Sequence, residues 1–358
     1  MLVHFTEFST IPIAWRVLFP LVLLSTTNAF TPMTSAKSAE KHVIRNSTSG
    51  ADIGIDETAT PEFLAVGDDP SSEKSSYIAY HLYSPSIPTA TTSDKHPILR
   101  PGVLFCGGFS SSMTGNKAIA LEAQSRELGL RYCRFDYRGH GSSSGSFIDH
   151  TLSDWIQDTK SILDHAFPTL ASNNGKSDFG GYNGKVVLVG SSMGGWIALH
   201  IAQAFPDRIA GIIGVATAPD FLHSMQQDFT VEQSKALDEH GIVTLESDYD
   251  IESLKLSHKL LEDAEQWRVF NTRSSDNRTN LDADTTVEPA FKVLPIPCPV
   301  RLLHGQLDDD VPWQRSLELS EILETNDVTV TIIKNGDHRL SSERDLKLLK
   351  AALLDMTS

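Results

Sequence analysis

The segment "VLVGSSMGGWIAL" (187–199) places Ser192 midway between two glycines, after an aliphatic run and before an apolar, helix-like stretch. A strand that turns at once into a helix bends so tightly that side chains beside the bend collide, which explains Gly190 and Gly194. The residue at the apex points outward beside the first N–H groups of the helix, where the dipole stabilises an anion. Ser192, rather than the neighbouring Ser191, is therefore the predicted nucleophile.

A serine hydroxyl is a weak nucleophile at neutral pH, so it needs a histidine base and a carboxylate that orients the histidine. Asp308 follows a predicted strand in "LLHGQLDDDVPW", and His338 follows the last predicted strand in "KNGDHRLS". Because the carboxyl ends of parallel strands form one edge of a sheet, we expect both to meet the serine there. Asp309 and Asp310 compete for the role of the acid, but we expect them to be exposed or to cap the helix that begins near Pro312.

A developing oxyanion needs two backbone donors, one directly after the nucleophile and one from the loop after an earlier strand. The first is the N–H group of Met193. The second candidate is the N–H of Phe109 in "FCGGFSSSMTG" (105–115), where two glycines allow the backbone to approach a substrate. A flexible glycine-rich turn is the alternative interpretation of this loop.

Short apolar runs alternate with amphipathic segments after about Phe63, which predicts an α/β fold with a mostly parallel central sheet flanked by helices. An early edge strand is expected in "SSYIAYHLYSP" (75–85). The other predicted strands are 101–106, 132–137, 185–190, 210–216, 299–305 and 328–333. The predicted helices are 116–128, 152–167, 193–204, 313–323 and 342–356.

Residues 219–297 interrupt this alternation, since they contain amphipathic helices and no convincing strand. An inserted helical cap between two core strands of a single domain over 62–358 fits this pattern. Several apolar cap residues recur at helical spacing, and they either pack onto the core or line a groove for an acyl chain. They are Ile251, Leu254, Leu256, Leu260 and Leu261.

The first 61 residues differ in composition from the rest of the chain. Residues 1–29 contain Arg16, a short apolar core and small residues near Ala29, which predicts a signal peptide. Residues 30–61 are rich in Ser, Thr and Lys and predict a disordered linker or a transit segment. The residues "AFTP" at the junction resemble the presequences of algae with complex plastids. We therefore expect a plastid or a secretory compartment, with mitochondria as the alternative.

Composition limits the partners. A net charge of −16 over 358 residues argues against nucleic acid and anionic membranes, so the expected partner is an acylated protein or a small acyl ester. The apolar core of the front segment is far shorter than the roughly 20 residues of a transmembrane helix, so no transmembrane span is expected. Cys106, Cys133 and Cys298 lack metal-ligand spacing and are expected to be buried thiols, so neither a metal nor a cofactor is predicted.

The motifs "RFDYRGHGSSSG", "LVGSSMGGW", "CPVRLLHG", "DDDVPW" and "DHR" together resemble the α/β-hydrolase superfamily from Phe63 to the C-terminus. Within it the chain is similar to the palmitoyl-protein thioesterase and mycophenolic acid acyl-glucuronide esterase family of animal mitochondria. The resemblance implies a monomeric serine hydrolase that cleaves acyl thioesters or esters, with Ser192, Asp308 and His338 as its triad. A carboxylesterase or monoacylglycerol lipase, and a non-catalytic ligand-binding fold, remain alternatives.

Overall fold

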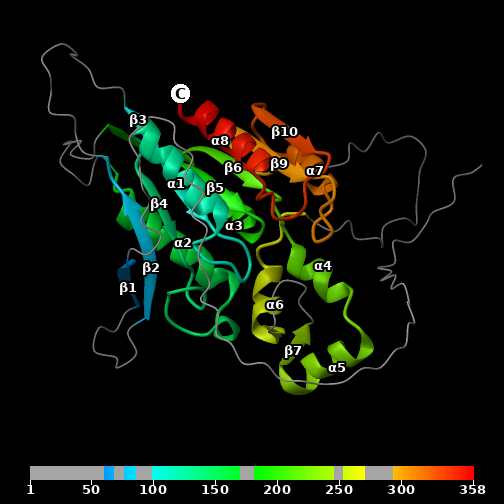
Figure 1. Cartoon of the computed structure of the whole chain (residues 1–358). Coiled ribbons are helices and arrows are strands. Elements are labelled where there is room, and N and C mark those ends of the chain that lie inside the picture. Colours follow the sequence, from blue (N-terminus) through cyan, green and yellow to red (C-terminus); the bar gives the residue numbers. More distant parts are fainter. Residues whose placement is uncertain (1–59, 68–75, 86–98, 170–180, 246–252, 271–292) are drawn as a thin grey trace, which may run out of the picture. The chain divides into compact units, whose positions relative to one another are not determined.

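The computed structural model describes residues 60–67, 76–85, 99–169, 181–245, 253–270 and 293–358, all within one compact unit, Asp52–Ser358. Its centre is an eight-stranded sheet with the order β1-β2-β4-β3-β5-β6-β9-β10 (Figure 1). The strands are β1 Glu62–Val66, β2 Ser76–Tyr83, β3 Arg100–Cys106, β4 Tyr132–Phe135, β5 Tyr182–Ser191, β6 Ile209–Val215, β9 Val300–Gly305 and β10 Val328–Ile333. Strand β2 runs antiparallel to β1 and β4, and the other pairs are parallel, so the prediction of a mostly parallel sheet is confirmed. Strand β1 was not predicted.

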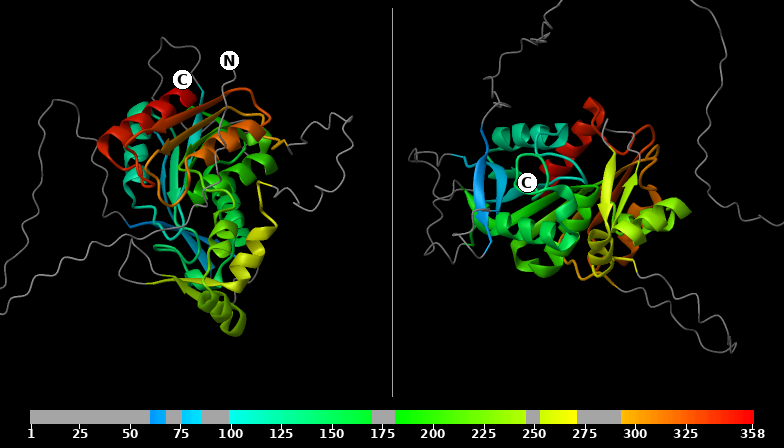
Figure 2. Two further views of the ribbon diagram at one scale, coloured as in Figure 1. Left: turned by 90° about the vertical axis from the view of Figure 1, so that its right-hand side faces the viewer. Right: turned by 90° about the horizontal axis from the view of Figure 1, so that it is seen from below.

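Both faces of the sheet are buried, as a parallel sheet between helices requires. In β3, Val103 and Phe105 belong to one apolar cluster, while Leu104 and Cys106 belong to the other. Helices α1 Asn116–Leu128 and α8 Glu343–Thr357 contribute to the first cluster. The second takes residues from α2 Leu152–Ala166, α3 Met193–Ala204 and α7 Gln314–Ile322, and Figure 2 shows the helices on the two sides of the sheet.

Local sequence explains where the flanking helices begin. Thr151 and Asp154 form a capping box at the start of α2, in which each side chain accepts a hydrogen bond from the backbone of the other. Ser342 and Asp345 repeat the arrangement at the start of α8. Such boxes satisfy N–H groups that a helix leaves unpaired, so they fix the first turn.

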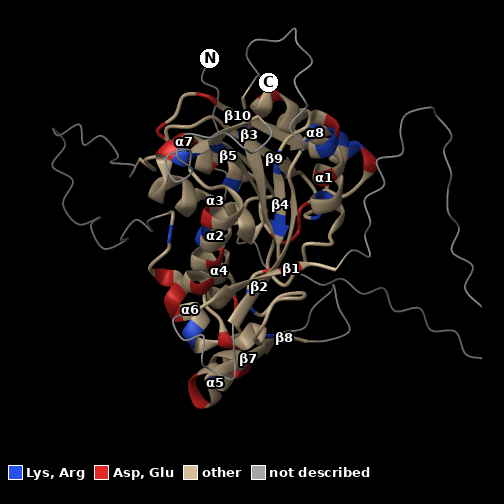
Figure 3. Ribbon diagram, turned by 90° about the vertical axis from the view of Figure 1, so that its left-hand side faces the viewer, with Lys and Arg blue, Asp and Glu red and all other residues tan. Residues whose placement is uncertain are grey.

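The segment between β6 and β9 contains α4 Phe221–Gln227, α5 Val231–His240, β7 Ile242–Leu245, β8 Leu254–Ser257 and α6 His258–Glu265. The expectation that it has no strand is wrong, because β7 and β8 pair antiparallel, with Ile242 opposite Ser257. Each strand has only four residues, and so short a run does not distinguish a strand from a helix even where, as in residues 254–257 (LKLS), apolar and polar residues alternate. Asp and Glu residues are frequent in α5 and α6 (Figure 3).

The apolar cap residues belong mainly to the core. Leu256, Leu260 and Leu261 are at most 3% exposed and join the main apolar cluster, whereas Leu254 is half-buried against it. The helical spacing assumed for them holds only from His258 onward, because residues 254–257 are a strand. Ile251 lies outside the described residues.

The cap segment is tied to the core by polar contacts with α2 and α3. The carboxylate of Asp263 accepts hydrogen bonds from the N–H and hydroxyl of Ser153, at 2.8 and 2.6 Å. The indole N–H of Trp267 also donates to the Ser153 hydroxyl, at 2.8 Å, and the Trp267 carbonyl accepts from Trp196 and His200. These bonds fix α6 against the body of the domain.

Asp220 secures the two ends of the same segment. It lies just after β6, is 3% exposed and has a left-handed backbone (φ 60°). Its carboxylate oxygens accept from the N–H groups of Val269 and Phe270, at 2.7 and 2.8 Å. Burial raises the pKa of Asp220, and those bonds and the nearby Arg268 oppose the effect. The chain therefore returns from the cap at a fixed point beside the end of β6.

The predicted signal peptide (1–29) and nearly all of the linker or transit segment (30–61) lie outside the described residues. Among the residues that the structure describes, no helix is long and apolar enough to cross a membrane. Cys106, Cys133 and Cys298 are free and buried, as predicted, and burial raises the pKa of Cys106 to about 12.

Candidate active site

Ser192 lies between the end of β5 and the first turn of α3, in a backbone conformation that non-glycine residues rarely adopt (φ 54°, ψ −117°). Such strain persists only where the surroundings hold it. The Ser192 N–H donates to the Val215 carbonyl at 2.9 Å, and its carbonyl accepts from Gly195 and Ala218. The neighbouring strand and helix therefore fix the turn that presents the hydroxyl.

Gly190 and Gly194 are needed because backbone packs directly against them. A Cβ on Gly194 would lie 2.1 Å from the carbonyl oxygen of Cys106 and 2.4 Å from that of Gly107. A Cβ on Gly190 would lie 2.4 Å from the Gly194 carbonyl oxygen. The glycines thus let α3 begin against the end of β3, which brings the following loop close to Ser192.

The three predicted side chains meet at the carboxyl edge of the sheet. Nε2 of His338 lies 3.1 Å from Oγ of Ser192, and Nδ1 lies 2.8 Å from Oδ2 of Asp308. The Asp308 side chain is fully buried, whereas that of His338 is 19% exposed. A carboxylate bound to one ring nitrogen and a hydroxyl bound to the other is the geometry in which an imidazole can take the hydroxyl proton.

Several donors surround the Asp308 carboxylate. Oδ1 accepts from the N–H groups of Asp310 and Val311, at 3.0 and 2.7 Å, and Oδ2 also faces Nε2 of His304 at 3.1 Å. Burial alone would raise the pKa of Asp308, but the bonds from His304, His338 and Val311 outweigh it and hold the pKa below its usual range. The carboxylate therefore stays ionised beside His338.

The competing carboxylates occupy different positions. Asp309 and Asp310 are both exposed. A carboxylate oxygen of Asp310 nevertheless lies within 4.8 Å of the oxygen of Asp308 and the ring nitrogen of His338. Asp308 is the acid that makes the short, buried hydrogen bond to the imidazole.

The loop after β3 lies against Ser192, since a Cβ on Gly108 would be 3.5 Å from the Cβ of Ser192. Within the described residues, the N–H groups of Phe109 and Met193 donate to no other group of the protein. The next N–H along the loop, that of Ser110, donates to Nε2 of His140 at 3.3 Å. The Phe109 N–H is therefore free to donate to a substrate, whereas the Ser110 N–H is already bound to His140.

Buried polar groups of β4 and of the chain just after it hold this loop. The Met113 N–H donates to Asp136 at 2.6 Å, and its carbonyl accepts from Arg134 at 3.1 Å. His140, which holds Ser110, is 4% exposed, and burial lowers its pKa to about 4. The neutral imidazole can accept the Ser110 N–H, whereas a protonated ring could not.

Half-buried aromatic rings flank the loop. Phe109 packs edge-on against Phe147 and Phe221, with ring centroids 4.9 and 5.1 Å apart. Phe147 belongs to the short 3₁₀-helix Phe147–Asp149, and Phe221 is the first residue of the cap helix α4. An apolar surface built from three separate segments thus adjoins the free N–H of Phe109.

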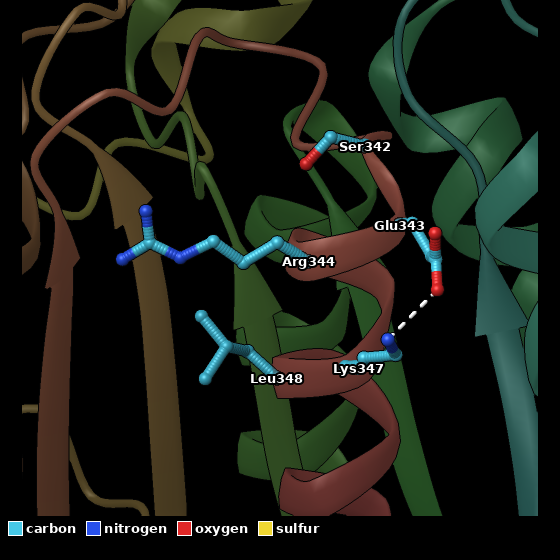
Figure 4. A pocket seen from close by; sticks show the side chains of 5 residues that line it. All are labelled: Ser342, Glu343, Arg344, Lys347 and Leu348. Carbon is cyan, nitrogen blue, oxygen red and sulfur yellow. Dashed lines mark ion pairs between the residues drawn. The ribbon is translucent and has the colours of Figure 1, made fainter.

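The hollows on the described surface include two that differ in their relation to the site. One adjoins the site and is lined by Ser110, Ser111, Ser112, Gly139, His140, Gly141 and Phe147. The other lies on the first turns of α8, where Glu343 pairs with Lys347 at 2.7 Å (Figure 4). Neither lining includes Ser192, Asp308 or His338, but the first includes Ser110 and His140, which follow and hold the loop that carries Phe109, so the first hollow is the one beside the candidate site.

The chain is similar to known hydrolases. Residues 100–345 match the family described as serine aminopeptidase, S33, a hydrolase family. This chain belongs to that α/β-hydrolase family. Mouse palmitoyl-protein thioesterase ABHD10, mitochondrial, is 35% identical over 257 residues, which are 72% of this chain and 75% of the mouse protein.

Two solved α/β-hydrolase structures are similar to the chain. A putative hydrolase from Agrobacterium vitis S4 has a TM-score of 0.66 and 31% sequence identity. Alpha/beta hydrolase domain-containing protein 10 from mouse has a TM-score of 0.62 and 31% identity. Each comparison covers 83% of this chain and 98% of the other. The chain is thus a serine hydrolase of the α/β-hydrolase family.

Two residues of this α/β-hydrolase site were not singled out from the sequence, although both lie in quoted motifs. They are His140 in "RFDYRGHGSSSG" and His304 in "CPVRLLHG". A lone histidine in a strand or loop carries no distinctive signal, because its role depends on partners that only the fold supplies. Each of them is next to a glycine in its motif, and a neighbouring glycine does not predict a side-chain hydrogen bond.

Proposed function

We propose that Ser192, His338 and Asp308 hydrolyse acyl thioesters or esters through an acyl-enzyme. The observation that carries this proposal is the 3.1 Å separation of Ser192 Oγ from His338 Nε2, with Asp308 bound to the other ring nitrogen. His338 takes the hydroxyl proton as Oγ attacks the carbonyl carbon. The N–H groups of Phe109 and Met193 donate to the oxyanion that forms.

The intermediate then breaks down by losing its leaving group. His338 returns the proton to a departing alcohol, whereas a thiolate can leave first and take the proton from the imidazolium afterwards, so that the imidazole is neutral again in either case. Water, activated by the same imidazole, next attacks the acyl carbon and frees Ser192. Asp308 holds the ring and stabilises the imidazolium in both halves of the reaction.

A long acyl chain is the proposed substrate feature. Phe109, Phe147 and Phe221 present apolar surface beside the oxyanion donors, and the mouse relative is named a palmitoyl-protein thioesterase. The substrate is then an acylated protein or a small acyl ester. A carboxylesterase or monoacylglycerol lipase activity would use the same three residues, so acyl preference must separate these functions.

A fluorophosphonate probe tests the nucleophile. Wild-type protein should be labelled at Ser192, Ser192→Ala should not be labelled, and Ser191→Ala should keep the wild-type rate. A wild-type protein that does not react would favour the non-catalytic, ligand-binding alternative. Labelling that persists in Ser192→Ala would refute the assignment.

A series of S-acyl substrates tests the acyl preference. Each buried methylene contributes about 0.8 kcal/mol, so kcat/KM should rise severalfold per methylene until the apolar surface is filled. The matching peptide amides should not be cleaved, because an amine leaves poorly. A profile that peaks at acetyl would instead favour a short-chain carboxylesterase.

We also propose that the protein acts inside an organelle. The curated relative from mouse is named mitochondrial, while the front of the chain favours a plastid or secretory route. N-terminal sequencing of the native protein, with fractionation of its cells, tests the proposal. A presequence removed near Ala29 supports the signal peptide, and an intact Met1 contradicts it.

A further inference from the structure

A second histidine contacts the same oxygen of the Asp308 carboxylate as His338. His304 belongs to β9, and its side chain is fully buried. Nε2 of His304 lies 3.1 Å from Oδ2 of Asp308 and 3.0 Å from the carbonyl oxygen of Val311. Nδ1 lies 2.7 Å from the hydroxyl oxygen of Ser316 in α7.

These partners determine which ring nitrogen carries the proton. Both groups that face Nε2, a carboxylate and a carbonyl, are acceptors only, so Nε2 must donate. In that tautomer Nδ1 is an acceptor, and the Ser316 hydroxyl can donate to it. A chain of hydrogen bonds therefore runs from Ser316 through His304 to Asp308, and from there to His338 and Ser192.

The same Nε2–H also links the two ends of the segment that carries the acid. It contacts Asp308 at one end and Val311 at the other, while the Val311 N–H donates back to Oδ1 of Asp308. Because the carboxylate is buried, no water is available to replace a lost donor. The orientation of Oδ2 toward His338 thus depends on His304.

We propose that His304 is a positioning residue for the reaction, which aims Oδ2 of Asp308 at His338 and withdraws part of its negative charge. This inference rests on the proposed function of Ser192, His338 and Asp308. Without the Nε2–H donor, Oδ2 keeps more charge facing His338 and stabilises the imidazolium more strongly. His338 then accepts a proton at higher pH, and the ring is held less firmly for attack.

A pair of variants separates donation from packing. His304→Leu keeps an apolar side chain but removes the donor, and kcat/KM should fall about 10- to 100-fold, as for loss of a hydrogen bond to a charged group. His304→Gln places an amide N–H near the position of Nε2, and it should recover to within about threefold of wild type.

The pH profile supplies a readout that a packing role would not change. In His304→Leu the acid limb of kcat/KM should move to higher pH by about half a unit to one unit, and in His304→Gln it should return. The other charged groups around His338 are the same in every variant. They are Asp310, whose carboxylate lies near the ring, and the sequence neighbours Asp337 and Arg339.

The outcomes are distinct. A wild-type profile in His304→Leu overturns the proposal, and so does a loss of rate with an unmoved acid limb and no recovery in His304→Gln. If His304→Leu does not fold, His304→Asn replaces it, since its shorter amide reaches only the position of Nδ1 and should behave as a variant without the donor.

The proposed function can fail separately from this inference. A wild-type protein that neither reacts with the fluorophosphonate nor hydrolyses esters would refute the proposed function. NMR titration of the His338 ring in wild type and in His304→Leu would still decide the present inference, because it requires no turnover. Identical titration curves would overturn it.

Discussion

The carboxylate of Asp263 caps a helix to which it does not belong, by accepting the backbone N–H and the hydroxyl of Ser153, 110 residues earlier in the chain. Ser153 lies in the first turn of α2, where helical N–H groups have no partner within the helix. The cap segment thus supplies a hydrogen-bond acceptor for the first turn of the core helix α2.

Asp263→Ala should therefore destabilise the whole domain. We expect the free energy of unfolding to fall by about 1–2 kcal/mol, the usual cost of losing a cap or a hydrogen bond to a charged group. Urea unfolding measures it. The matched control is Glu262→Ala, one residue earlier with a side chain 70% exposed, which should change the value by less than about 0.5 kcal/mol. Equal effects in the two variants would contradict the capping role.

Gly194→Ala should be severely destabilising. The added methyl group would overlap the carbonyl oxygens of Cys106 and Gly107, which are backbone atoms that cannot move aside without displacing β3. We expect a loss of about 3 kcal/mol or more in the free energy of unfolding, with loss of fluorophosphonate labelling. Gly115→Ala is the control, because its Cβ would meet only the Ser112 carbonyl oxygen, at 3.4 Å. Gly194→Ala protein as stable as that control would refute the packing argument.

His140 should make the fold sensitive to mild acid. Burial lowers its pKa to about 4 from an ordinary 6.5, so between these values the unfolded chain binds a proton that the folded protein does not. Stability therefore falls as pH falls through this window, by about 2 kcal/mol between roughly pH 7 and pH 5.

Comparison with a variant isolates this contribution. His140→Gln keeps an acceptor for the Ser110 N–H but does not titrate, so its free energy of unfolding should fall less between the two pH values. Burial also lowers the pKa of His200, but that residue is present in both proteins and cancels in the difference. If the free energy of unfolding changes equally with pH in the two proteins, His140 does not contribute to the acid sensitivity.

Asp308→Asn should reduce kcat by several orders of magnitude, on the order of 10⁴-fold, because an amide favours the wrong tautomer of His338. Asp309→Asn and Asp310→Asn are the controls. Asp310→Asn is the more demanding, since its carboxylate lies near the imidazole yet is exposed. A large loss of kcat in Asp310→Asn with little loss in Asp308→Asn would show that Asp310, and not Asp308, orients His338.

Much of the candidate site could be predicted from the sequence, because short local patterns mark the positions of its residues. A strand, a glycine, a serine and a glycine mark the turn at Ser192, and short loops after two later strands carry Asp308 and His338. The order of parallel strands then explains why these distant segments meet at one edge.

The remainder depends on contacts that no local pattern reveals. The cap strands β7 and β8 have four residues each, and they are recognisable only when paired. The hydrogen bonds between Ser153 and Asp263 join segments 110 residues apart, and no pattern in either segment predicts that they meet. His304 is a single polar residue in an apolar strand, and its importance follows from the position of Asp308 relative to its ring.

The strand order also has a consequence for biosynthesis. His338 follows β10, which lies at the end of the sheet and pairs with β9, while Ser192 is made nearly 150 residues earlier. A growing chain therefore carries its nucleophile long before it carries the base. Until β10 has been synthesised and has joined β9, Ser192 has no imidazole beside it. If Ser192 and His338 act as proposed, the unfinished chain should therefore be inactive toward esters, and hydrolysis should begin only when the last strand has joined the sheet.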